Sequence, residues 1–256
     1  MNRVAYCYLT DLKNDLDMFA WSEASLRHHC GDVDVFVCTA GRREGAVDIS
    51  GTFREVYGKD VDPLAKCRGN GKFPLLVFGK FILGMCPEFA SYDRVVAMDG
   101  DIEVFDGRFA GLGQLPFPDD ADVGLHLGVA GPAHRLWSGT PAPFANLWYG
   151  ARVPYSNTGL VVCRPGWRAG FVDALRGALA ASERYRLFLP EEHAALVYLR
   201  RWFFPREFHQ IVPKDVVRDG RELEYAKVAY AVHYAGPLRK KWVRDRWRRR
   251  AEETYA

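Results

Sequence analysis

The chain has no apolar run long enough to span a bilayer, and its first residues do not form a secretion signal. Met1 to Arg3 lead straight into a strand-like segment, without an apolar region followed by a cleavage site. We therefore expect a cytoplasmic protein. The strongly basic C-terminal segment is also compatible with peripheral attachment to the inner face of a membrane.

The spacing Cys-x-x-Cys is absent among the six cysteines. Cys7, Cys38 and Cys163 lie inside apolar strand-like runs, where a thiol behaves as a small hydrophobic side chain. Such cysteines are typical of the reduced core of a cytosolic protein. Internal repeats, low-complexity segments and clear linkers are also absent, so the 256 residues favour one continuous domain.

Short apolar runs alternate with helical segments, which predicts βαβ units and a largely parallel sheet flanked by helices, an α/β fold. The expected strands are 4–9, 33–38, 95–98, 121–125, 159–163, 209–212 and 228–234, with a further candidate at 53–57. The expected helices are 15–29, 75–89, 166–185 and 191–202. Residues 107–154 are rich in Gly and Pro and contain several aromatic residues, and we expect long functional connections there.

The most informative motif is Asp99-Gly100-Asp101, which directly follows the apolar run 95–98. Ligands of open α/β sheets bind beyond the carboxyl ends of the strands. Alternate residues of an extended segment point to the same side, so the two carboxylates can converge on one site. A hard divalent cation, which commonly bridges to a diphosphate, would relieve their repulsion. The alternative interpretation is an ordinary turn with acidic flanks.

Four further segments strengthen the interpretation of the aspartate pair as a metal site. In chain order they are Tyr155 to Gly159 before a buried strand, Glu191-Glu192-His193 after Pro190, His233 to Gly236 at a strand end, and Arg239 to Trp242. In patches from Val4 to about Trp242, this order resembles the nucleotide-sugar glycosyltransferases of family 8. The resemblance implies a retaining enzyme with a single Rossmann-like domain of the GT-A type. We assign 1–238 to this domain and 239–256 to a basic C-terminal helix.

The resemblance also implies a metal site. In the family, an Asp-x-Asp motif and a later histidine ligate Mn²⁺ on the donor diphosphate, and these roles fall on Asp99, Asp101 and His233. A neutral imidazole beside two carboxylates suits such an ion, with Mg²⁺ as the alternative. Taken alone, His233 at the end of an apolar strand is more typical of a hydrogen-bonded, partly buried histidine, and it is the aspartate pair together with Gly236 that favours a metal ligand.

A cation for the diphosphate follows the histidine. The family element His-x-x-Gly-x-x-Lys-Pro-Trp resembles the segment from His233 through Gly236 to Trp242, with Arg239 at the lysine spacing, Lys240 next, and no proline before the tryptophan. Arginine is a good bidentate phosphate partner, so the cation is retained. Whether Arg239 or Lys240 contacts phosphate stays open.

The resemblance distributes the remaining donor contacts along the chain. It implies that Thr10 and Asp11 bind the nucleoside and that Lys80 contacts the donor. Without the resemblance, Lys80 would be interpreted as a lysine on a helix surface. Gly100, Gly159 and Gly236 belong to the motifs around the donor. The sugar site is assigned to Asn157, Glu191 and Glu192. An ordinary turn at 157–159 and helix-dipole acids after Pro190 are the alternatives.

The residue chemistry agrees with glycosyl transfer. Breaking a sugar–phosphate bond builds negative charge on the leaving diphosphate, which a divalent ion and a basic side chain stabilise. The developing oxocarbenium ion needs a nearby carboxylate or amide oxygen, and Glu191 or Glu192 could supply one. Whether the reaction forms a covalent intermediate is not decided by these residues.

The basic charge of the chain is concentrated near its C-terminus. Of 35 basic and 32 acidic residues, eight basic and one acidic lie between Arg239 and Arg250, which leaves 27 and 31 elsewhere. Trp242, Val243 and Trp247 can share one face of a helix there. This pattern resembles an interfacial helix that lies on an anionic membrane surface, and a helix that packs its tryptophans on the body is the alternative. Nucleic acid is not expected, because no reading motif accompanies the charge.

The leading hypothesis is a metal-dependent hexosyltransferase that uses a UDP-sugar donor and a glycan or lipid-linked acceptor, with retention. The aromatic residues from Trp137 to Tyr149 are expected to contact the acceptor. One rival is an inverting transferase or a sugar-1-phosphate nucleotidyltransferase. The latter normally has a Gly-rich, Arg-Lys-containing loop where this chain has Thr10 to Lys13. Another rival is a basic-tailed module that binds membrane or nucleic acid.

Overall fold

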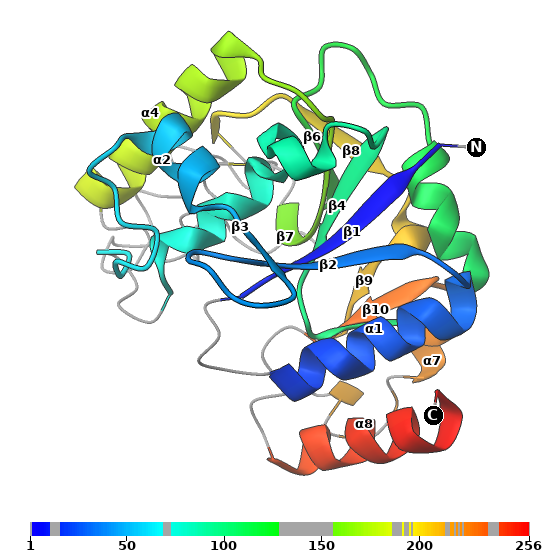
Figure 1. Ribbon diagram of the computed structural model, residues 1–256. Coiled ribbons are helices and arrows are strands. Elements are labelled where there is room, and N and C mark those ends of the chain that lie inside the picture. The colour runs from blue at the N-terminus through cyan, green and yellow to red at the C-terminus, as the bar shows by residue number, and fades with distance from the viewer. Residues whose placement is uncertain are drawn as a thin grey trace, which may run out of the picture.

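The computed structural model describes most of the chain, namely residues 2–10, 16–68, 73–127, 156–185, 191, 195, 197–212, 216–217, 219, 221, 223–234 and 241–255. As the sequence predicted, the fold is α/β with a central seven-stranded sheet (Figure 1). Its strand order is β3 (Ala46–Asp48), β2 (Asp34–Thr39), β1 (Val4–Leu9), β4 (Arg94–Met98), β7 (Ser156–Cys163), β6 (Val123–Leu127) and β8 (Arg201–Phe204).

The central sheet is mostly parallel. Among these seven strands, β7 alone runs against its neighbours β4 and β6, and the remaining neighbouring pairs are parallel. Strands of this kind are covered on both faces, which is why β1 and β4 are nearly continuous apolar runs. The strand expected at 4–9 is confirmed to the residue.

Two layers cover the two faces of the sheet, because successive side chains of a strand point to opposite faces. Cys7 and Ala97 belong to the cluster that includes α2 (Ser50–Tyr57) and α4 (Ala169–Tyr185). Tyr8 and Val96 belong to the cluster on the other face, which includes α1 (Leu16–Cys30). Figure 1 shows α2 and α4 together on one side of the sheet and α1 on the other.

A small second sheet continues from the end of β4. It consists of β5 (Ile102–Val104), β10 (Ala231–His233) and β9 (Gln210–Ile211), with β10 in the middle, antiparallel to β5 and parallel to β9. This sheet lies near α1, and the C-terminal helix α8 (Lys241–Thr254) lies along α1 (Figure 1). The remaining short elements are η1 (Leu75–Phe81), η2 (Leu83–Met85), η3 (Pro87–Phe89), η4 (Gly107–Gln114), η6 (Arg206–Phe208) and α7 (Leu223–Ala226).

The C-terminal helix packs against the body. Trp247 is only 1% exposed and its ring meets those of Trp21 and Tyr234 at centroid distances of 5.6 and 5.4 Å. This is the arrangement that the packed-helix interpretation predicted for Trp247. Among the helices of the described residues, none combines the length and the apolar character needed to cross a membrane.

Three predicted elements are wrong. The segment 53–57 is helical, because Phe53, Val56 and Tyr57 bury one helix face, and three apolar residues in so short a segment fit either period. The helix predicted at 75–89 is a series of three 3₁₀ turns. A Cβ at Gly84 would lie 2.1 Å from the Arg164 carbonyl oxygen, so this glycine is needed for close packing. The helix predicted at 191–202 does not reach its predicted end, since Arg201 and Trp202 belong to β8.

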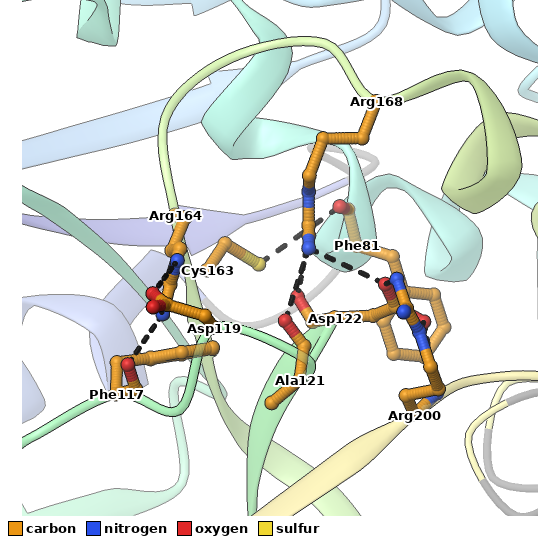
Figure 2. Close-up of polar contacts among 9 residues, drawn as sticks. All are labelled: Phe81, Phe117, Asp119, Ala121, Asp122, Cys163, Arg164, Arg168 and Arg200. Atoms are coloured by element: carbon orange, nitrogen blue, oxygen red, sulfur yellow. Dashed lines mark hydrogen bonds and ion pairs between the residues drawn. The ribbon is translucent and has the colours of Figure 1, made fainter.

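A charged cluster joins strands β6 and β8 to α4 at the end of the sheet where β6 and β8 begin (Figure 2). Asp122 is almost fully buried and accepts from the Arg200 guanidinium at 2.8 Å and from the Arg200 backbone N–H at 2.9 Å. Arg168 donates to the Asp122 carboxylate at 3.3 Å and to the Ala121 carbonyl at 3.0 Å. The cluster thereby sets the register of β6 and β8, whose opposite ends lead toward the aspartate pair.

Candidate functional site

The Asp-x-Asp motif forms a tight connection between β4 and β5. The Asp99 backbone N–H donates to the Gly159 carbonyl at 2.8 Å, which ties the end of β4 to β7. A Cβ at Gly100 would lie 2.6 Å from the Phe19 ring of α1. Glycine is therefore required at Gly100 by the close approach of α1, and this packing holds the two aspartates at the carboxyl end of β4.

His233 lies beside these aspartates although about 130 residues of chain separate them. Antiparallel pairing of β10 with β5 sets His233 opposite Ile102, directly after Asp101. The His233 Nε2 atom is 3.0 Å from Asp101 Oδ1 and 3.9 Å from Asp99 Oδ2. One ligand atom from each of the three side chains lies within 4.8 Å of the others.

The electrostatics of the cluster arise from close, buried charges. Burial favours the neutral form of Asp101, but the His233 imidazole and the Lys80 ammonium lower the pKa of this carboxyl below its usual value. Burial likewise opposes the charged form of His233, but Asp101 and Asp99 raise the pKa of the imidazole. The two carboxylates therefore favour a positive charge beside them. Two carboxylates and an imidazole form an oxygen-rich donor set that suits a hard divalent cation.

Lys80 lies inside the site, so the surface-lysine interpretation is wrong. The residue comes from η1 and is 8% exposed. Its ammonium is 2.5 Å from Asp99 Oδ1 and donates to the Thr158 carbonyl at 3.0 Å. Burial would lower the pKa of Lys80, but Asp99 and then Glu191 raise it above the usual value. Lys80 is therefore a buried, charged ammonium in contact with the cluster.

The Asn-x-Gly segment begins β7 and lies under the histidine. The Gly159 backbone N–H donates to the Asn157 Oδ1 atom at 2.8 Å, and both residues are buried. A Cβ at Gly159 would lie 2.2 Å from Cε1 and 2.5 Å from Nδ1 of His233. The glycine is therefore needed because the imidazole packs directly on the backbone of β7.

Glu191 is a buried carboxylic acid in electrostatic contact with this site. Its Oε2 atom has no hydrogen-bond partner within the part of the chain that the structure describes. Burial raises the pKa of Glu191, the Lys80 ammonium lowers it, and the Asp99 carboxylate raises it. A first-turn acid that only complements a helix dipole would be solvated, so the burial of Glu191 argues for a role in the site.

Thr10 lies at the carboxyl end of β1, as predicted, where it is buried and its backbone N–H donates to the Cys38 carbonyl at 3.1 Å. Several predicted contacts lie outside the described residues, and their assignments stay predictions. They are Asp11, the aromatic segment from Trp137 to Tyr149, Glu192, Gly236, Arg239 and Lys240.

Two further buried histidines, to which the sequence pattern assigns no role, adjoin the site. The His209 ring is 5.2 Å from the His233 ring and 4.7 Å from the His126 ring, between centroids. His126 pairs with Asn157 across β6 and β7. Burial lowers the pKa of His126 to about 4 and that of His209 well below the usual value, so both imidazoles are neutral. They come from separate strands with no common motif, and only the folded chain brings them together.

No protein-family model and no curated protein sequence matches the chain. Solved structures do match. The galactosyltransferase LgtC, solved with donor and acceptor sugar analogues, is 12% identical, with a TM-score of 0.57 over 97% of this chain and 95% of LgtC. Mouse xyloside xylosyltransferase 1 is 11% identical, with a TM-score of 0.53 over 92% of this chain and 98% of that protein.

A third similar structure is the bifunctional glycosyltransferase WbbM, which is 14% identical, with a TM-score of 0.56. The match covers 92% of this chain but only 46% of WbbM, so the chain spans less than half of that protein. At these identities the similarity concerns the fold. The chain has the GT-A fold of glycosyltransferases, with a mostly parallel central sheet flanked by helices.

Proposed function

We propose that this protein is a metal-dependent glycosyltransferase of family 8 type. In this proposal it moves a hexose from a UDP-sugar to a glycan or lipid-linked acceptor with retention. The observation that carries the proposal is the convergence of Asp99, Asp101 and His233 within 4.8 Å, in a chain with the GT-A fold. The fold alone does not establish the activity, because one fold hosts many functions. The arrangement of charged side chains supplies the chemical argument.

Asp99, Asp101 and His233 would hold Mn²⁺ or Mg²⁺. His233 offers Nε2, the atom that faces both carboxylates, and its Nδ1 atom packs toward Gly159. A bound ion would supply charge neutralisation for the diphosphate as the sugar–phosphate bond breaks. The two carboxylates would hold such an ion at the carboxyl end of β4, which is where ligands of open α/β sheets bind.

Lys80 supplies a second cation at the same place. Its ammonium contacts Asp99, so it would lie close to a diphosphate bound at that carboxylate and could neutralise part of its charge. Arg239 or Lys240 is proposed as a further phosphate contact. Thr10 and Asp11 are proposed to hold the nucleoside, because β1 ends beside β4 in the sheet.

Asn157 and Glu191 are proposed to line the sugar. The hydrogen bond from Gly159 fixes the Asn157 amide. Glu191 lies close enough to Lys80 and Asp99 for their charges to shift its pKa. When ionised, a buried carboxylate stabilises a developing oxocarbenium ion more strongly than a solvated one, because the surroundings screen it less. Glu192 completes this proposed set.

The proposed acceptor is a glycan or lipid-linked sugar, with Trp137 to Tyr149 as its contact. An acceptor sugar analogue is present in the LgtC structure named above. We also propose that 1–238 form the transferase domain and that 239–256 can meet an anionic membrane surface. Arg248 and Arg249 are exposed on α8, whereas Trp247 is buried against the body. Contact through this helix would therefore be electrostatic.

A thermal-shift panel tests the proposed function. The chain is heated with UDP, GDP, CMP and UDP-sugars, each with and without Mn²⁺, and the melting temperature is measured. We expect Mn²⁺-dependent stabilisation by UDP and UDP-sugars, because a ligand that binds only the folded state raises its stability. Release of UDP from a UDP-sugar in the presence of acceptor glycans then measures the transfer.

Asp101→Asn is the informative variant, since it keeps the shape of the side chain but removes a charged ligand. Asp119→Asn is the matched control, because Asp119 is fully exposed. We expect Asp101→Asn to lose the Mn²⁺-dependent shift and Asp119→Asn to keep it. Stabilisation by GDP or CMP alone would overturn the donor assignment, and UDP stabilisation that is independent of metal would overturn the metal site.

A further inference from the structure

A buried carboxylate lies two residues after the metal motif. Glu103 is the central residue of β5 and is 0% exposed. Its carboxylate accepts from the Tyr234 hydroxyl at 2.7 Å, from the Tyr255 hydroxyl at 2.9 Å and from Arg250 Nε at 2.9 Å, with a further contact from Arg250 Nη2. We refer to Glu103, Tyr234, Arg250 and Tyr255 as the Glu103 network.

The Glu103 network draws its members from β5, from the end of β10 and from the C-terminal region. Glu103 lies on β5, which begins directly after Asp101, and Tyr234 directly follows His233, the last residue of β10. Arg250 belongs to α8 and Tyr255 comes just after it. A buried carboxylate without partners is strongly destabilising. The hydrogen bonds to Glu103 therefore favour the position of β5 and β10 in which they form.

The backbone links this network to the ligands themselves. The Tyr234 N–H donates to the Asp101 carbonyl at 2.9 Å, and His233 pairs with Ile102. Ser22 of α1 donates to the Ile102 carbonyl at 2.5 Å. The β5–β10 pair is thus held both by α1, through Ser22, and by α8, through Arg250.

We propose that Arg250 is a positioning residue for the metal cluster and acts on Asp101 and His233 through Glu103 and Tyr234. The inference rests on the proposed function, since it concerns the cluster named there. It makes α8 a structural part of the site. A guanidinium can bridge the Glu103 carboxylate and the Tyr234 hydroxyl at once, and Arg250 does so, with its Nη2 atom 2.7 Å from that hydroxyl. Without this bridge, β5 and β10 can shift relative to each other, and the ligand atoms separate.

The test measures Mn²⁺ binding to the full chain without donor, by the loss of the electron-paramagnetic-resonance signal of free Mn²⁺. We expect Arg250→Met to weaken Mn²⁺ binding about tenfold, the lower end of the usual effect of losing an outer-shell partner. Arg250→Lys should recover part of the affinity, since it keeps the charge but not the fork geometry. Arg248→Met is the matched control on the same helix, because Arg248 is exposed and pairs with Asp245 at 3.5 Å.

A second control separates positioning from general loss of stability. Leu175→Ala on α4 removes a fully buried side chain from the core cluster on the opposite face of the sheet. It should lower the melting temperature and leave Mn²⁺ affinity unchanged. If Arg250→Met does not fold, Tyr234→Phe decides, because it removes one hydroxyl from the network and keeps the ring that packs on Trp247. We expect it to weaken Mn²⁺ binding about threefold, a part of the tenfold effect.

The outcomes are distinguishable. A wild-type chain that binds no Mn²⁺ overturns the proposed metal site, and the inference fails with it. A wild type that binds Mn²⁺ together with a folded Arg250→Met or Tyr234→Phe of equal affinity overturns the inference alone. A loss of affinity in Leu175→Ala equal to that in Arg250→Met would also overturn it, since the effect would then follow stability.

Discussion

The Lys80 ammonium lies 2.5 Å from Oδ1 of Asp99, so one of the proposed metal ligands is already paired with a cation of the chain itself. The Lys80 ammonium would repel a divalent ion at Asp99, because both are positively charged. The same ammonium would attract the negatively charged diphosphate of a donor. Lys80 therefore has opposite effects on the binding of the metal alone and on the binding of metal together with donor.

The first prediction follows from this relationship. We expect Lys80→Met to bind Mn²⁺ about fivefold more tightly than the wild type in the absence of donor, because a competing charge is removed. The same variant should bind UDP with Mn²⁺ at least about tenfold more weakly, which is about 1.4 kcal/mol. Isothermal titration calorimetry measures both, with the exposed Lys59→Met as control. A parallel fall in both affinities would contradict the competition.

The second prediction concerns the contact between Gly159 and His233. A methyl group at Gly159 would overlap the imidazole, at 2.2 Å from Cε1, so Gly159→Ala must displace the ring. We expect Mn²⁺ affinity to fall at least about tenfold and stability to fall by about 1–3 kcal/mol. Gly170→Ala is the control, because nothing lies within 4 Å of a Cβ there. Equal Mn²⁺ affinity in the two variants would argue against His233 as a ligand.

The third prediction is a pH dependence of stability. Burial lowers the pKa of His126 to about 4, below the ordinary 6.5 of an exposed histidine. Between these values the unfolded chain binds a proton that the folded chain does not, so this term destabilises the fold as pH falls from about 6.5 to about 4. At pH 5 it amounts to about 2 kcal/mol.

His126→Phe removes this titration while keeping an aromatic ring beside His209. The free energy of unfolding, measured by urea denaturation at pH 7 and pH 5, should therefore fall less in the variant than in the wild type, by about 2 kcal/mol. An identical fall in both proteins would show that His126 is not held neutral by the fold.

The fourth prediction separates stability from the site. Asp122 joins Arg168 and Arg200 at the end of the sheet opposite the aspartate pair. We expect Asp122→Asn to lower the free energy of unfolding by about 2 kcal/mol, because two guanidinium groups lose their buried counter-charge. Mn²⁺ affinity should be unchanged. The exposed Asp119→Asn should change stability by less than about 0.5 kcal/mol. A loss of Mn²⁺ binding in Asp122→Asn would mean that the two ends of the sheet are coupled.

Local patterns predicted much of the fold. The runs at 4–9 and 159–163 are buried strands because continuous apolar, β-branched sequences suit a sheet covered on both faces. The errors at 53–57 and 75–89 arise because the spacing of apolar residues in these segments fits more than one kind of secondary structure. Their structure depends on neighbours, as at Gly84, where the Arg164 backbone excludes a side chain.

Local sequence patterns were enough to predict that two carboxylates follow a buried strand in a mostly parallel sheet, and hence at which edge of the sheet a site can form. The motif pattern also assigns His233 and Lys80 to the site, but how they and Arg250 reach it follows from the tertiary structure. His233 reaches Asp101 through the pairing of β10 with β5, Lys80 reaches Asp99 from η1, and Arg250 reaches Glu103 from the last helix. Contacts between such distant segments depend on strand register and on the neutralisation of buried charge, and no local pattern of residues encodes either.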